Sequence, residues 1–101
     1  MTAKLVVLYT QPADPAGFDR HYFDTHMPLV NSIPGLLRAE TGRFIAAADG
    51  AEATYYRIAS LYFDSPEAMD AAFKSPEGAA TAKDYAQLAP PGSRMFATEL
   101  D

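Results

Sequence analysis

Residues 55–63 constrain the fold most, because both alternating sides of this run are largely apolar or aromatic. Such residues favour a β-strand, and strict alternation places Tyr56 and Arg57 on opposite sides. The run 5–9 has the same two-sided character. An antiparallel sheet with one face in water alternates apolar and polar residues instead. We therefore expect helices on one sheet face and the sheet of a second copy on the other, in a homodimer.

The start of the first helix is marked by Asp14 followed by Pro15. An aspartate side chain accepts hydrogen bonds from free backbone amides, and proline suits the first helical position. Pro28 disfavours helical geometry at Met27. This helix is therefore expected to break or kink at Met27.

A Ser-Pro-Glu triplet occurs at 65–67 and again at 75–77, and each copy predicts the N-terminus of a short helix. The second of these helices is expected to run over 79–88. Further strands are expected over 36–47 and 95–100. The order β-α-β-β-α-α-β predicts an α+β fold, namely a ferredoxin-like βαββαβ protomer with a split second helix and a four-stranded antiparallel sheet.

The composition excludes several classes of function. The 101 residues fit one domain spanning 1–101. A net charge of −5, with eight scattered Lys and Arg residues, disfavours binding to nucleic acid or to acidic membranes. The absence of cysteine excludes disulfides and thiolate chemistry. The apolar run 5–9 is too short for a signal peptide or membrane span, so the cytoplasm is the expected location.

His26 is the strongest candidate for a catalytic residue. Phe18, Tyr22 and His26 recur every four residues and share one helix face, which directs the imidazole toward the sheet. A neutral imidazole near pH 7 can accept or donate a proton. The alternative is a structural role, in which His26 caps helix carbonyls or fixes the turn at Pro28. His21 lies about 140° away around an α-helix and is expected to face solvent.

Asp84 interrupts the otherwise apolar segment 79–88. It can orient His26 as a second catalytic residue, or it can lie on a solvated helix face and pair with Lys83. Two histidines five residues apart, without a cluster of carboxylates, do not match the usual spacing of metal ligands. No Gly-rich phosphate loop is present. Neither a metal nor a cofactor is therefore expected.

Tyrosines provide candidates for substrate binding. Tyr9, Tyr22 and Tyr62 can line an aromatic pocket and donate hydrogen bonds to a ligand oxygen, with packing in the core as the alternative. Two strand arginines, Arg38 and Arg57, can hold a carboxylate if they point inward. A salt bridge or a contact in the dimer is the favoured interpretation for both arginines.

Several of these motifs together resemble the EthD-like family. They comprise 12–18, Tyr22, 26–29 (His-Met-Pro-Leu) and 33–36 in the N-terminal half, and 61–65, 68–69, 75–78 (Ser-Pro-Glu-Gly) and Asp84 in the C-terminal half. The resemblance implies a ferredoxin-like protomer and a dimeric α+β barrel. It also implies relatives linked to ethyl tert-butyl ether degradation alongside an oxygenase system. Related barrels include cofactor-free monooxygenases, lactone isomerases and polyketide cyclases.

Two functional hypotheses follow, with a purely structural dimer as a third. The first is an enzyme that acts on a small hydrophobic oxygenated compound, with His26 as general acid or base. Its reaction would be an isomerisation, a cyclisation or a cofactor-free oxygenation. The second is a protein that binds such a compound without turnover, or that assists an oxygenase degradation system.

Overall fold

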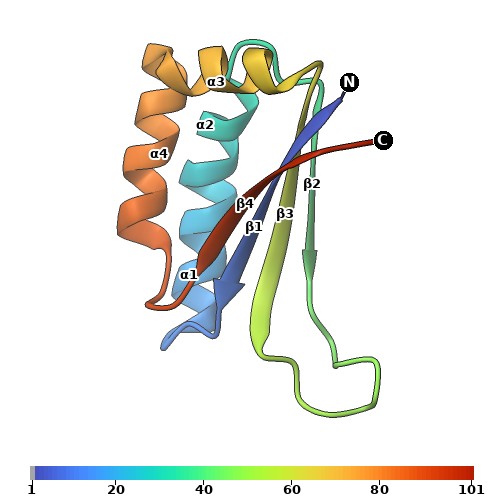
Figure 1. Cartoon of the computed structure of the whole chain (residues 1–101). Coiled ribbons are helices and arrows are strands. Elements are labelled where there is room, and N and C mark those ends of the chain that lie inside the picture. The colour runs from blue at the N-terminus through green and yellow to red at the C-terminus, as the bar shows by residue number, and fades with distance from the viewer. Residues whose placement is uncertain (1) are drawn as a thin grey trace.

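The computed structural model describes residues 2–101, which form nine helical and strand elements (Figure 1). In chain order they are β1 (Ala3–Thr10), α1 (Pro15–His21), the π-helical turn η1 (Tyr22–His26), α2 (Met27–Asn31), β2 (Arg38–Arg43), β3 (Tyr55–Phe63), α3 (Pro66–Lys74), α4 (Pro76–Leu88) and β4 (Arg94–Glu99). This order confirms the α+β class, with the second helix split into α3 and α4.

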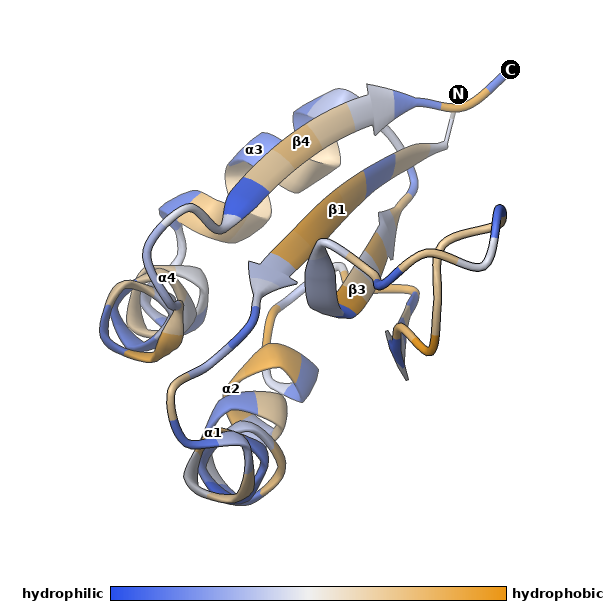
Figure 2. Cartoon of the chain, turned by 90° about the horizontal axis from the view of Figure 1, so that it is seen from below, coloured by the Kyte–Doolittle hydropathy of each residue, from blue (hydrophilic) through white to orange (hydrophobic). Residues whose placement is uncertain are grey.

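The four strands form one antiparallel sheet in the order β2-β3-β1-β4. Figure 2 shows the helices gathered on one side of this sheet. The arrangement confirms the ferredoxin-like fold. Strand β2 is shorter than predicted, because its pairing with β3 ends near Phe44, whose amide donates to the Tyr56 carbonyl at 2.9 Å.

The predicted helix caps are confirmed, although α4 begins at Pro76 and not at the expected residue 79. The Asp14 side chain accepts a hydrogen bond from the Gly17 amide at 3.2 Å. Ser75 ends α3 and also starts α4, because its hydroxyl oxygen accepts from the Gly78 amide at 3.0 Å. A Cβ atom at Gly78 would collide with the backbone of α3 at Ala72. This tight corner sets where α4, and with it Asp84, lies over the sheet.

Of the two outcomes predicted at Met27, a break or a kink, the break does not occur. Met27 and its neighbours keep helical backbone angles, and the helix continues through α2 to Asn31. The disturbance is a π turn, in which the Met27 amide donates to the Tyr22 carbonyl five residues earlier. Pro28 has no amide hydrogen, and its ring crowds the carbonyl of Asp24 in a regular α-helix. The wider turn takes up that conflict without ending the helix.

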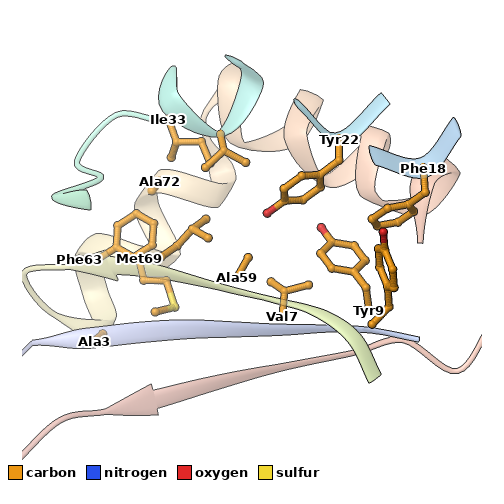
Figure 3. Close-up of a cluster of buried hydrophobic side chains, with 13 residues drawn as sticks. Ala3, Val7, Tyr9, Phe18, Tyr22, Ile33, Ala59, Phe63, Met69 and Ala72 are labelled. Atoms are coloured by element: carbon orange, nitrogen blue, oxygen red, sulfur yellow. The ribbon is translucent and has the colours of Figure 1, made fainter. Parts of the chain in front are cut away.

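The core lies between the helices and the inner sheet face, where Figure 3 shows Tyr22 reaching down from the helical layer and Tyr9 rising from the sheet. Tyr56 joins this layer, although strict alternation placed it on the other face. The pairing of β1 with β3 shifts between Tyr9 and Thr10, which inserts one extra residue in β3. Such a bulge lets Tyr56 and Arg57 both point inward, and both are buried.

The outer sheet face carries no helix and is only partly covered in a single chain. Val6, Leu8, Ile58 and Tyr62 are half-buried there, and Phe96 is 43% exposed. Apolar colouring continues along β1 and β4 in Figure 2. Within residues 2–101, none of the helices combines the length and apolar character needed to cross a membrane.

Candidate functional site

A cavity of about 280 Å³ lies between the inner sheet face and the helices. Its walls are mostly aliphatic and aromatic, with Val7, Ala59 and Leu61 from the sheet and Val30 and Phe73 from the helices. The side chains that bring polar groups to this lining are those of Tyr9, Tyr22, His26, Thr81 and Tyr85, whereas the carboxylate of the lining residue Glu40 bonds to Tyr62 on the outer sheet face. No lysine or arginine of the described chain contributes to the lining. The site is therefore suited to an uncharged ligand.

His26 lies at the end of the π turn and is 4% exposed. Its Nδ1 is 2.8 Å from Asp84 Oδ2, and its Nε2 is 3.4 Å from the Tyr9 hydroxyl. The imidazole also stacks on the Tyr22 ring, with a centroid distance of 5.7 Å. An ionised carboxylate can only accept hydrogen bonds, so Nδ1 carries the proton of neutral His26. The lone pair of Nε2 then faces Tyr9 and the cavity.

Asp84 approaches His26 from α4 and is 8% exposed. Its carboxylate also accepts from His21 Nε2, at 2.9 Å to Oδ1 and 3.1 Å to Oδ2. His21 is partly exposed, as expected, with 38% of its side chain in contact with solvent, but its contact with Asp84 was not predicted. The prediction for His21 assumed α-helical spacing, whereas the π turn between the two histidines brings residues five apart to one side. Pro28 indicated a disturbance of the helix near Met27, but not that it would take the form of a π turn.

The three candidate tyrosines do not lie together. Tyr9 and Tyr22 both line the cavity, and the Tyr22 hydroxyl is 2.8 Å from the Thr41 hydroxyl. Tyr62 lies on the outer sheet face, where its hydroxyl donates to Glu40 at 2.8 Å. Successive side chains of a strand point to opposite sheet faces, so Tyr9 on β1 and Tyr62 on β3 lie on different faces. Tyr62 therefore cannot contact a ligand held beside His26 in the same chain.

Both candidate arginines pair with acidic side chains and leave the cavity uncharged. Arg57 is buried, lies 3.7 Å from Asp19 and donates to the Thr41 hydroxyl at 3.2 Å. Its guanidinium also stands 5.0 Å from the Tyr22 ring centroid. Arg38 is exposed and pairs with Glu40 at 3.2 Å. The Arg57–Thr41–Tyr22 chain, which sequence reasoning missed, fixes the ring that stacks on His26.

The sequence profile of the EthD domain family matches residues 10–91. The chain belongs to the EthD family. It is 41% identical over 96 residues to an uncharacterized 11.0 kDa protein in the thcB-thcC intergenic region of Rhodococcus erythropolis. That match covers 95% of this chain and 92% of the relative.

Solved structures agree with the family assignment. An EthD family protein of Bacillus halodurans matches with a TM-score of 0.93 and 35% identity, over 100% of both chains. A cofactor-independent oxygenase of Streptomyces nogalater matches with a TM-score of 0.71 and 17% identity, over 98% of this chain and 92% of the other. At that identity the likeness shows a shared fold alone.

In this EthD domain, burial and hydrogen bonding set the charge of each site residue. Burial lowers the pKa of His26 below the usual histidine range, although the hydrogen bond and charge of Asp84 oppose it. Burial alone would raise the pKa of Asp84, but the hydrogen bonds from His21 and His26 outweigh it and lower the pKa. Burial raises the pKa of Tyr9, and the neighbouring Tyr22 adds to the effect. Near neutral pH the site thus holds a carboxylate, a neutral His26 and a protonated phenol.

This combination can move a proton. A neutral imidazole oriented by a carboxylate accepts a proton at Nε2, and the carboxylate stabilises the imidazolium that forms. The Tyr9 hydroxyl can donate a hydrogen bond to an oxygen atom of a ligand in the cavity. Within residues 2–101, no group of three or more His, Cys, Asp or Glu side chains is arranged to hold a metal ion.

Proposed function

We propose that this EthD family protein binds a small, uncharged, largely apolar oxygenated compound and transfers a proton to or from it through His26. The observation that carries the proposal is the pair of contacts at His26, with Asp84 2.8 Å from Nδ1 and the cavity beside Nε2. A buried histidine that is merely structural has no need of an orienting carboxylate on one nitrogen and an open cavity beside the other.

The proposed reaction begins when Nε2 removes a proton from a carbon next to a carbonyl group of the ligand. The C–H electron pair then moves to form an enolate, whose oxygen accepts a hydrogen bond from the Tyr9 hydroxyl. Nδ1 keeps its proton and donates to Asp84, so the positive charge of the imidazolium is balanced. Returning the proton from Nε2 to another carbon of the enolate completes an isomerisation. In a cyclisation the enolate carbon instead bonds to a second carbonyl carbon of the ligand, the π pair of that carbonyl moves to its oxygen, and Nε2 returns the proton to this oxygen.

Deuterium exchange in D₂O tests this step without knowledge of the natural substrate. A set of uncharged one-ring and two-ring ketones and phenols is first screened by thermal stabilisation. We expect the protein to catalyse deuterium incorporation next to the carbonyl of a ketone that binds, as measured by NMR. The variant His26→Gln should lower that rate by about 10²- to 10⁴-fold. The control Tyr62→Phe, on the outer face, should leave it unchanged.

The strongly apolar lining also favours a second function, which is binding without turnover, either alone or in support of an oxygenase. That function predicts equal thermal stabilisation of the wild type and of His26→Gln by the same ketone. It also predicts deuterium incorporation no faster than in buffer. This outcome would contradict the catalytic proposal and leave the binding proposal standing.

We also propose that the outer sheet face packs against the same face of a second copy. The half-buried Val6, Leu8 and Ile58 and the exposed Phe96 support this, because a soluble sheet seldom leaves such a row to water. Light scattering at micromolar concentration should give twice the 10.9 kDa mass of the chain. The variant Phe96→Asp should give the mass of one chain. A monomeric wild type would contradict the homodimer.

A further inference from the structure

Asp84 holds two imidazoles, although the proposed function uses only one of them. Its Oδ2 is 2.8 Å from His26 Nδ1, and its Oδ1 is 2.9 Å from His21 Nε2. The two histidines differ in their access to water, since the His26 side chain is 5% exposed and the His21 side chain 38%. One carboxylate therefore connects a buried base to an imidazole at the surface.

The helix makes an irregular turn at the point that brings the two histidines together. Residues five apart in an α-helix lie about 140° apart, so His21 and His26 would not reach one carboxylate. In the π turn the Met27 amide donates to the Tyr22 carbonyl, so this turn contains one residue more than an α-helical turn. Such turns are rare and occur often at functional sites. Here the result is a second contact to Asp84.

The two contacts differ in their surroundings, because the His26 side chain is buried whereas part of the His21 side chain meets water. In either protonation state, His21 can donate a hydrogen bond from Nε2 to Asp84. Only the charged state balances the carboxylate. Resting on the proposed function of His26, we propose that His21 is a positioning residue: in its charged form it balances the Asp84 carboxylate that both histidines share, and so favours a neutral His26 that is free to accept a proton.

The electrostatics of His26 agree with this geometry. After burial, the groups that act on its pKa are Asp84, which raises it through a hydrogen bond and its charge, and His21, whose charge lowers it. Tyr9 on β1 and Tyr22 on the same helix also face the ring, and burial raises the pKa of each, so both are neutral near pH 7. A change of charge at position 21 should therefore change the pKa of His26.

Two substitutions at position 21 separate charge from structure. His21→Gln places a neutral side chain that can donate to Asp84, whereas His21→Lys places a charged donor there. The chain has two histidines, so in both variants His26 gives the only imidazole signal in an NMR titration. We expect the pKa of His26 to be higher in His21→Gln than in His21→Lys. His21→Ala, which needs no new contact, should raise it in the same direction as His21→Gln.

The reference variant Asp84→Asn should lower the pKa of His26, because the carboxylate that raises it is gone. Equal His26 pKa values in the Gln, Ala and Lys variants would overturn the inference and leave His21 a tether of α1 to α4. The titration needs no substrate. If the pKa values move as expected but no ketone exchanges deuterium, the proposed catalysis fails and the coupling between the histidines stands.

Where a ketone does exchange, the pH profile gives a second readout. Protonation of His26 removes the base, so the rate falls on the acidic side of the pKa of His26. We expect this acidic fall at higher pH in His21→Gln and at lower pH in His21→Lys. A purely structural role would lower the rate equally at all pH values.

Discussion

The two faces of the sheet use similar side chains in opposite ways. On the inner face, the Tyr9 hydroxyl lies 3.4 Å from His26, which contacts a nearly buried Asp84. On the outer face, the Tyr62 hydroxyl donates to Glu40, which pairs with an exposed Arg38. Both clusters join a strand tyrosine to an acid and a basic group. Only the inner one has its tyrosine and its basic group in the lining of a cavity.

The difference between these clusters is exposure to water. Water screens the outer ion pair and can replace each of its hydrogen bonds, so its contribution to stability is small. The inner groups have little water, and each must be satisfied by the protein or by a ligand. The same exclusion of water that makes the inner cluster costly to disturb also lowers the pKa of His26.

Removing the acid of each cluster, Asp84 or Glu40, should give the largest difference in the free energy of unfolding between the two faces. Asp84→Ala leaves His26 buried without its acceptor, so we expect the free energy of unfolding to fall by about 2–3 kcal/mol. In the monomeric Phe96→Asp background, Glu40→Ala removes an exposed partner and should change the free energy of unfolding by about 0.5 kcal/mol or less. Urea denaturation measures both. Equal losses would contradict the distinction between the faces.

Acidification should weaken the inner cluster selectively. In the folded state the pKa values of both His26 and Asp84 lie below their usual ranges, so the unfolded chain binds more protons as the pH falls. The contribution of His26 is present above about pH 6.5 and is lost as the pH falls through its folded pKa. The contribution of Asp84 is present above about pH 4 and is lost below that value.

Urea denaturation at pH 7.5 and pH 5.5 measures the first of these losses. The free energy of unfolding should be lower at pH 5.5, and the decrease should be smaller in His26→Gln, which cannot be protonated there. Glu40→Gln, on the outer face, should keep the wild-type decrease. A wild-type stability that rises on acidification would have the wrong sign for a buried neutral His26.

The smallest difference in unfolding free energy is expected between removal of the Tyr9 hydroxyl and removal of the Tyr62 hydroxyl. Tyr9→Phe removes a buried hydroxyl beside His26 and should cost about 1 kcal/mol of unfolding free energy. Tyr62→Phe removes one at the surface and should stay within about 0.5 kcal/mol. If Tyr62→Phe costs more than Tyr9→Phe in the protein as it exists in solution, the outer face is more buried there than in a single chain.

Sequence predicted the parts of this molecule that depend on local chemistry. Asp14, Ser65 and Ser75 were identified as caps because a cap requires only a side-chain oxygen three residues before a free amide. The strand 55–63 was predicted with its observed bounds, because its composition excludes most other structures. The contact of Asp84 with His26 was one of two interpretations left open for an acid in an apolar helical segment, the other being a solvated helix face.

The features that sequence missed depend on departures from regular geometry. His21 reaches Asp84 only through a π turn, and Tyr56 turns inward only through a bulge. Each irregularity adds one residue to a regular repeat. Pro28 indicated a disturbance near Met27 but not its π geometry, and no residue type marked the bulge in β3. Tyr62 was misplaced for another reason, since alternation gives two faces without saying which one meets the helices.

The protonation of the two nitrogens of His26 tests the central claim most directly. In a ¹⁵N-labelled His21→Gln variant, where His26 is the only imidazole, two-bond ¹H–¹⁵N correlation at pH 8 distinguishes the two neutral tautomers. We predict a proton on Nδ1, held by Asp84, and an unprotonated Nε2 toward the cavity. A proton on Nε2 with Nδ1 bare would mean that Asp84 does not orient His26, and would contradict the proposed base.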